Sequence, residues 1–244
     1  MKIAVLSDIH GNIGALDAVL AHVKGHSVDL TVNLGDICSG PLWPCETADR
    51  LIALDLPTIR GNHERQLLEG AFDRLGLSDR HARATLRPDQ LAWMADLPAT
   101  LRLTDDVLLV HGTPDSDLIY FLETVTSEGV RPATLPEVQD RAGPVDARLI
   151  LCGHTHVARA VRLPGGCLIV NPGSVGLPAY DDIHPFPHVI ENGAPHARYA
   201  VVSNEKGSWE ASFHMVAYDW EQAACDAEAN GRADWARALR TGTM

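Results

Sequence analysis

Five short motifs place aspartate, histidine and asparagine residues in a fixed order along the chain. They are Ser7-Asp8-Ile9-His10, Gly35-Asp36, Gly61-Asn62-His63-Glu64, Val110-His111-Gly112 and Gly153-His154-Thr155-His156. Carboxylate, amide and imidazole groups are ligands for divalent metal ions, and a mixture of them suits transition metals. The ordered set therefore predicts a metal site, with enough ligands for two ions.

The spacing within the motifs indicates how these ligands divide. Asp8 and His10 are separated by one residue, so in an extended segment both side chains project to the same side and can bind one ion. A carboxylate such as that of Asp36 can bridge two cations. We expect one ion to be held by Asp8, His10, Asp36 and one histidine of the pair His154 and His156. The second ion would be held by Asp36, Asn62, His111 and the other histidine of that pair.

Short apolar runs with the character of β-strands precede four of the five motifs. The runs at 2–7, 29–34 and 57–60 each end at a motif, and helices are expected at 13–23 and 46–54. Alternating strands and helices indicate a parallel α/β sheet, in which polar loops meet beyond the carboxyl ends of the strands. These elements would bring the predicted ligands together.

The rest of the chain predicts a second sheet of more antiparallel character. Strands are expected at 100–103, 107–110, 148–151, 157–163, 167–170, 199–203 and 208–216, and helices at 63–97 and 219–240. Residues 116–142 are expected to form one or two helices that cover the site, and 177–197 a loop rich in Pro, His and Gly. We predict one domain over residues 1–244, in which these last two segments could act as lids over the site.

Composition and charge exclude several classes of function. The chain has 244 residues, 45% of them hydrophobic, which is enough for a large core, and its formal net charge is −12. A negative net charge without a Lys/Arg cluster opposes binding to a nucleic-acid duplex. No apolar run approaches the roughly 18 residues of a membrane span. The five scattered cysteines contain no C-x-x-C pair, and we expect a cytoplasmic protein with free thiols.

The ordered motifs resemble the signature of the calcineurin-like metallophosphoesterase superfamily. The resemblance covers residues 8–156, and Asn171-Pro172-Gly173-Ser174 is similar to a loop of small bacterial members. It implies a four-layer α/β/β/α sandwich, in which two mixed β-sheets are flanked by helices, and a dinuclear metal centre. It also implies that His156 joins the metal of Asp8 and His10, and that His154 joins the metal of Asn62 and His111. Manganese is our first choice of metal, and Fe, Zn, Co or Ni would also suit the ligands.

The resemblance implies a phosphoester hydrolase that acts on a small phosphorylated molecule, with a nucleotide as one candidate. Attack on phosphorus would be in line, by a hydroxide that bridges the two metal ions. His63 follows a predicted ligand, and we expect it to donate a proton or a hydrogen bond to the leaving oxygen. Residues expected to contact the substrate are Asn12, Arg60, Asn62 and Tyr180.

One departure from the superfamily pattern narrows the substrate class. Phosphoprotein phosphatases of the superfamily usually carry Asp-Arg-Gly shortly after the Gly-Asp block, whereas this chain continues as Ile37-Cys38-Ser39-Gly40. The absence of that arginine disfavours a Ser/Thr phosphatase, which is the alternative, and favours a small-molecule phosphodiesterase. A non-catalytic scaffold with this fold is a further alternative. It is disfavoured because all seven ligand positions hold competent residues.

Overall fold

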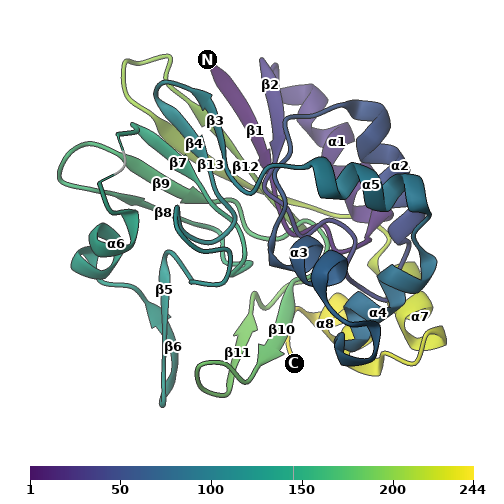
Figure 1. Ribbon diagram of the computed structural model, residues 1–244. Helices are drawn as coiled ribbons and strands as arrows, with labels where there is room; N and C mark the ends of the chain where they lie inside the picture. The colour runs from purple at the N-terminus through teal and green to yellow at the C-terminus, as the bar shows by residue number, and fades with distance from the viewer. Residues whose placement is uncertain (145) are drawn as a thin grey trace.

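The computed structural model describes residues 1–144 and 146–244, which contain two main mixed β-sheets that face each other (Figure 1). The first sheet has the order β13-β12-β1-β2, with strands Glu210–Val216, Ala197–Ser203, Lys2–Leu6 and Leu30–Asn33. The second has the order β3-β4-β7-β9-β8, with strands Leu101–Thr104, Val107–Leu109, Leu149–Leu151, Leu168–Asn171 and Arg159–Arg162. The predicted pair of mixed sheets is confirmed.

The side chains of the central strands alternate between two hydrophobic layers, one between the sheets and one under the helices. In β1, Ile3 and Val5 point into the core between the two sheets, whereas Ala4 and Leu6 pack against helices on the outer face. Val107 and Leu109 of β4 meet Ile3 and Val5 between the sheets. Because successive residues of a strand point to opposite faces, each central strand builds two core layers at once. Both faces of these strands are apolar, which explains the continuous apolar runs in the sequence.

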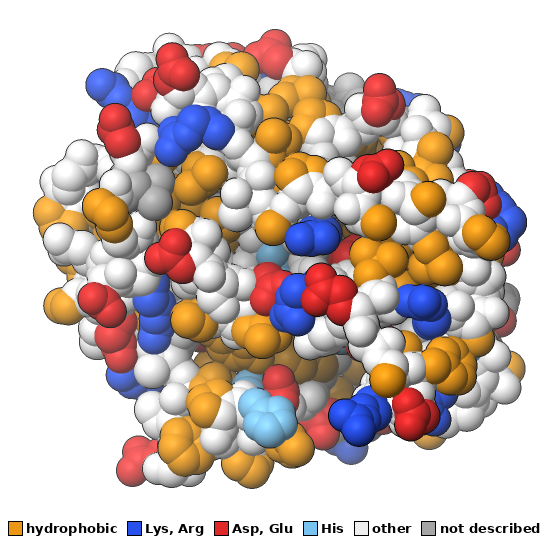
Figure 2. Space-filling view, in the orientation of Figure 1, with side chains coloured by type: hydrophobic (Ala, Val, Ile, Leu, Met, Phe, Trp, Pro, Cys, Tyr) orange, Lys and Arg blue, Asp and Glu red, His pale blue; other side chains and the backbone are white. Residues whose placement is uncertain are grey.

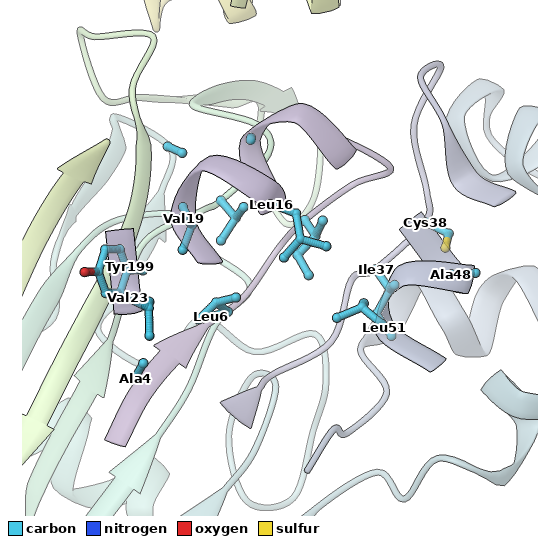
Figure 3. Close-up of a cluster of buried hydrophobic side chains, with 14 of the residues drawn as sticks. Ala4, Leu6, Leu16, Val19, Val23, Ile37, Cys38, Ala48, Leu51 and Tyr199 are labelled. Atoms are coloured by element: carbon cyan, nitrogen blue, oxygen red, sulfur yellow. The ribbon is translucent and has the colours of Figure 1, made fainter. Parts of the chain in front are cut away.

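Helices cover the outer face of the first sheet. In α1 (Ile13–Val23), Leu16, Val19 and Val23 are buried at the spacing of one helical face and pack near Leu6 (Figure 3). Complete burial of each such side chain stabilises the fold by about 1.5–3 kcal/mol. The neighbouring helices on this side are α2 (Pro44–Leu54) and α5 (Pro88–Asp96), which Figure 1 shows beside α1.

The remaining helices include one that covers the second sheet. Helix α6 (Leu135–Ala142) packs through Val138 and Ala142 against the outer face of the second sheet, which completes the α/β/β/α arrangement. The other elements are η1 (Lys24–His26), α3 (Asn62–Glu69), η2 (Phe72–Arg74), α4 (Leu77–Thr85), α7 (Trp220–Ala229) and α8 (Ala233–Thr241). Among the described residues, none of the helices has the length and apolar character needed to span a bilayer.

Parallel pairing brings the motif loops to one rim. β1 pairs in parallel with β2, and β4 pairs in parallel with β7, so the loops that follow these four strands leave the sheets in common directions. Asp8, Asp36, His111 and His154 all lie in those loops. Strand direction therefore accounts for the convergence of residues far apart in the chain.

Several sequence-based expectations need correction. Thr58 forms only an isolated bridge with Asn33 instead of a third strand at 57–60. The segment 116–142 contains the hairpin β5–β6 (Glu123–Thr126 and Gly129–Pro132) before α6, so it is not mainly helical. Residues 177–197 contain a second hairpin, β10–β11 (Ala179–Asp182 and His188–Glu191), instead of a loop. The buried positions of these short strands mix polar and apolar residues, such as Glu123 in β5 and His188 beside Ile190 in β11, so the sequence lacks the apolar alternation that predicts strands.

The second half of the chain also departs from the expected antiparallel sheet. β12 pairs antiparallel with β1, and β13 pairs antiparallel with β12, so both strands complete the first sheet. In the second sheet, β7 and β9 pair in parallel. Pairing between distant strands is a tertiary outcome, which local patterns do not determine.

Candidate active site

The first group of predicted ligands comes together at the end of β1. Asp8, His10 and His156 each present a ligand atom, and these atoms lie within 4.8 Å of one another. His156 Nε2 lies 3.1 Å from His10 Nε2 and 3.4 Å from Asp8 Oδ1. All three residues are buried. Two imidazole nitrogens and a carboxylate oxygen at these separations form a site that one cation could join.

The second group lies at the ends of β2, β4 and β7. Asp36, His111 and His154 also present ligand atoms within 4.8 Å of one another. His111 Nε2 lies 3.1 Å from Asp36 Oδ2 and 3.1 Å from Asn62 Oδ1. The structure thus divides the seven predicted residues into two sets and places His156 with the first and His154 with the second.

Backbone carbonyls fix the orientation of three imidazole rings. The Nδ1 atoms of His10, His111 and His156 lie 2.7, 2.8 and 2.8 Å from the carbonyl oxygens of Ser39, Leu34 and Leu177. A ring that donates its Nδ1–H to a carbonyl carries its free lone pair on Nε2. Metal-binding histidines are held in this way, because the second nitrogen determines the tautomer. The three Nε2 atoms, which face other members of the ligand groups, are therefore suited to bind metal.

Backbone conformation at these residues is unusual. Asp8, His10, Asp36, His154 and His156 all have φ between +53° and +70°. Residues other than glycine rarely adopt this left-handed region, and such strain persists where the surrounding structure imposes it, often at functional sites. Outside this set, only Ser27 and Asp55 among the described non-glycine residues share the property.

Two motif glycines are required by close packing. A Cβ at Gly61 would lie 2.2 Å from Asp36 Oδ1, and a Cβ at Gly153 would lie 2.0 Å from Ser7 Oγ. Neither distance is tolerable for a side chain. These glycines allow the loops after different strands to approach until the ligand atoms meet.

The electrostatics of the site favour cations. Burial would raise the pKa of Asp36, but the neighbouring His111 and His63 hold it well below its usual range. Burial would lower the pKa of His111, yet the charges of Asp36 and Asp8 and a hydrogen bond to Asp36 raise it to about 10. Burial and the charge of His156 lower the pKa of His10 to about 3. Buried carboxylates that draw protons onto nearby imidazoles would equally draw metal ions, so the donor set fits two divalent cations.

His63 belongs to neither ligand group, and its ring contacts Asp79, a residue outside the five motifs. Its Nδ1 lies 2.8 Å from Oδ1 of Asp79, a buried residue in the first turn of α4. Ser39 Oγ donates to the same oxygen at 2.6 Å. Burial would lower the pKa of His63, but the charge of Asp36 and the hydrogen bond and charge of Asp79 raise it to about 9. His63 lines the cavity beside the two ligand groups.

Glu64 has a structural role. Its carboxylate accepts hydrogen bonds from the backbone N–H groups of Gly61, Asp36 and Ile37, at 2.8, 2.9 and 2.7 Å. It therefore ties the loop after β2 to the start of α3 and fixes the separation between Asp36 and Asn62. The described contacts place it on backbone groups and not on His63.

A cavity of about 1510 Å³ extends from the ligand groups toward the surface, where Figure 2 shows this face of the molecule hollowed. Its walls come from α3, from the segment before β5, from the hairpin β10–β11 and from the start of α8. Tyr120 and Tyr180 line it with their hydroxyl oxygens 2.7 Å apart. Trp235 of α8 lines it as well, and its ring centroid lies 5.9 Å from that of His10. The segments predicted as lids, 116–142 and 177–197, both contribute to this wall.

Only some of the residues predicted to contact the substrate line the cavity. Tyr180 lines the cavity, and its ring packs edge-on against His156. Asn12 is buried and caps α1 by accepting from Ala15 N, while its amide donates to Gly176 O and Tyr218 Oη. Within the described part of the chain, neither Asn12 nor Arg60 lines the cavity. These contacts give Asn12 a structural role and leave no described contact of Arg60 with the site.

Sequence reasoning missed Asp79 and Trp235. Neither belongs to a motif, and each lies on a short helix whose approach to the site is decided by tertiary packing. Cys38 and Cys152, which flank the motifs, are buried free thiols whose pKa values are raised by burial. Neither belongs to the metal-competent groups of the described residues.

Known proteins resemble this chain in sequence and in structure. The sequence model of the calcineurin-like phosphoesterase superfamily domain matches residues 1–188. An uncharacterized protein of Methanocaldococcus jannaschii is 26% identical over 198 residues, which cover 72% of this chain and 76% of that protein. Among solved structures, a metallophosphoesterase from Sphaerobacter thermophilus aligns with a TM-score of 0.75 and 23% identity over 99% of each chain. A hypothetical protein from Pyrococcus horikoshii aligns with a TM-score of 0.77 and 19% identity over 99% of this chain and 98% of that chain.

Proposed function

Because the chain belongs to the calcineurin-like phosphoesterase superfamily, we propose that it is a metal-dependent hydrolase of phosphodiesters of small molecules. The observation that carries this proposal is the convergence of two buried ligand groups beside a histidine that is outside both. Two divalent ions bound there would supply a water molecule acidified to near-neutral pKa and would neutralise charge on the phosphoryl oxygens.

The protein residues would each have a defined task. Asp8, His10 and His156 would hold one ion, Asn62, His111 and His154 the other, and Asp36 would lie between them. Oxygen and nitrogen donors together suit Mn²⁺, which is the ion we would test before Zn²⁺, Fe²⁺, Co²⁺ or Ni²⁺. His63, held by Asp79, would donate its Nε2 proton to the leaving oxygen, a role that typically contributes about 10²–10⁴-fold to the rate.

The shape of the cavity supports a diester with an aromatic substituent. A diester places a group on each side of the phosphorus atom, and a cavity of about 1510 Å³ accommodates both. Small-molecule sites are commonly about 300–1,000 Å³ and are lined by apolar and aromatic side chains. Tyr120, Tyr180 and Trp235 supply such surfaces next to the ligand groups, and a nucleotide base is the aromatic group that we propose for them.

A direct test compares model substrates on Mn²⁺-loaded protein. We expect hydrolysis of bis-p-nitrophenyl phosphate to exceed that of p-nitrophenyl phosphate in kcat/KM, and a phosphoserine peptide to be a poor substrate. Asp36→Asn should abolish activity, whereas the exposed control Asp96→Asn should retain it. Preference for the phosphopeptide would favour a protein phosphatase. Metal-loaded protein that is inactive on all three substrates would favour a non-catalytic scaffold.

A further inference from the structure

Three histidines outside the active site form a separate cluster. His22 lies near the end of α1, His26 in η1, and His214 on the edge strand β13. Each offers a ring nitrogen, and these nitrogens lie within 4.8 Å of one another. The ring centroids are 5.0 Å apart for His22 and His26, 4.4 Å for His26 and His214, and 5.7 Å for His22 and His214. Three imidazoles from three elements therefore converge on one point.

The cluster is distinct from the active site. None of its three histidines is among the described residues that line the catalytic cavity. His22 comes nine residues after Ile13, the first residue of α1 and close to the active-site end of that helix, which corresponds to about 14 Å along the axis. The cluster is partly exposed, so a metal ion in solution can reach it.

Neighbouring side chains orient two of the rings. His22 Nδ1 lies 2.7 Å from the hydroxyl oxygen of Tyr199, and His214 Nε2 lies 3.2 Å from Ser212 Oγ. The ring of Tyr199 is packed in the core and stacked on His214, with centroids 4.9 Å apart. Figure 3 shows its hydroxyl pointing away from Leu6 and the rest of that cluster. When a hydroxyl group hydrogen-bonds one nitrogen of an imidazole, the other nitrogen is available to bind metal. Supporting residues orient metal-binding histidines in this way.

We propose that His22, His26 and His214 form a third metal site, which binds Zn²⁺ through three imidazole nitrogens and leaves one position for water. Three histidines with an open fourth position are an established coordination set for Zn²⁺. The set contains no carboxylate, so it favours Zn²⁺ over Mn²⁺ or Mg²⁺. The ammonium group of Lys2, which donates to the carbonyl of His26, adds positive charge nearby and would moderate the affinity.

The bound ion would connect elements that are far apart in the sequence. Helix α1 and η1 lie on the outer face of the first sheet, and β13 is the edge strand of that sheet. A ligand that binds only the folded chain stabilises it by an amount that grows with the logarithm of the ligand concentration relative to the dissociation constant. Zinc should therefore hold the end of α1 against β13.

The test measures how many equivalents of zinc bind to the wild type and to matched variants. His26→Ala is the main variant, because no described hydrogen bond involves its imidazole, and His214→Ala is the second. His81→Ala, outside every cluster, is the control. After equilibrium dialysis against buffered Zn²⁺, metal analysis should show one equivalent fewer in each cluster variant than in the wild type and in His81→Ala. Activity with Mn²⁺ should be unchanged in all four proteins.

Thermal unfolding provides a second measurement. At a free Zn²⁺ concentration ten times the dissociation constant, the rise in Tm should be larger for the wild type than for His26→Ala by about 3–6 °C. Equal zinc content in the wild type and in both cluster variants would overturn the proposal. So would a Tm rise of the same size in wild type and His26→Ala. Neither result depends on whether the chain hydrolyses phosphodiesters.

Discussion

The Nδ1 atom of His63 lies 2.8 Å from Oδ1 of Asp79, and the two residues come from the consecutive helices α3 and α4. The carboxylate is buried and also accepts from Ser39, so it is held from two sides. A ring that donates Nδ1–H to this carboxylate must present Nε2 to the cavity. We infer that Asp79 acts through His63, as a positioning residue.

Replacing Asp79 with Asn should impair proton donation by His63 more than metal binding. The amide keeps the size of the carboxylate but removes the charge that holds the protonated ring. We expect kcat to fall about 10–100-fold on diesters with poor leaving groups, the range typical of supporting residues at metal sites. With p-nitrophenolate, which leaves without a proton, the loss should be several-fold smaller. Rates for a series of leaving groups would measure the difference.

Asp73→Asn, an exposed residue of η2, is the matched control and should behave as wild type. A loss in Asp79→Asn that is equal for all leaving groups would point to structural damage instead of a role in proton donation. Metal content equal to that of the wild type would show that the ligand groups are intact.

Replacing Glu64 with Ala should destabilise the fold strongly. Three backbone N–H groups, those of Gly61, Asp36 and Ile37, would lose a buried acceptor. Each unsatisfied buried donor costs about 1–3 kcal/mol, so we expect the free energy of unfolding to fall by at least about 3 kcal/mol. Urea denaturation of the metal-free protein would measure it. Glu69→Ala, on an exposed position of the same helix, should change stability by less than about 0.5 kcal/mol.

The metal-free protein should be most stable near pH 6.5. Burial lowers the pKa of His10 to about 3 and that of His154 to about 4, so below pH 6.5 the unfolded chain binds protons that the folded chain does not. Stability is therefore lost as the pH falls. The charge of Asp36 outweighs burial and raises the pKa of His63 to about 9 and that of His111 to about 10. The effect of these two residues on stability therefore has the opposite sign. The folded chain retains their protons above pH 6.5, and this stabilisation is lost as the pH rises through 9 and 10.

Urea denaturation of EDTA-treated protein at pH 5, 6.5 and 9 would test this. Mn²⁺-loaded protein is the control, and it should become more stable from pH 6.5 to 8, because metal binding requires neutral imidazoles. A stability of the metal-free protein that increases steadily from pH 5 to 9 would contradict the prediction.

There is a physical reason why the fold and the two ligand groups could be predicted from the sequence. Asp8, Asp36, His111 and His154 follow apolar strands, and parallel pairing of β1 with β2 and of β4 with β7 makes the ends of those strands meet. The convergence of the motif residues therefore follows from strand direction.

Asp79 and Trp235 could not be predicted in the same way. Asp79 resembles any first-turn carboxylate of a helix, a position favoured by the helix dipole alone. Its contact with His63 depends on the angle between α3 and α4. Trp235 lies beyond residue 188, where the match to the family ends, and enters the site only because α8 packs back against Gly40. The hairpin β10–β11 was missed because its buried face mixes polar His188 with apolar Ile190, which weakens the apolar alternation of a strand.

Trp235 should influence substrate affinity more than turnover. Its ring lines the cavity, packs edge-on near His10, and is itself held by Arg232, whose guanidinium lies over the ring at 5.5 Å. Trp235→Leu preserves apolar volume but removes the aromatic face, which stacking on a base requires. Loss of one stacking contact costs about 1–3 kcal/mol. We therefore expect KM for the p-nitrophenyl ester of thymidine 5′-monophosphate to rise about 5–150-fold, while kcat changes little.

Steady-state kinetics on this substrate and on methyl p-nitrophenyl phosphate would separate stacking from general damage, because the methyl ester has no base to stack. Trp93→Leu, on α5 away from the cavity, serves as the matched control. An equal rise in KM for both esters would show that Trp235 shapes the site without contacting a base.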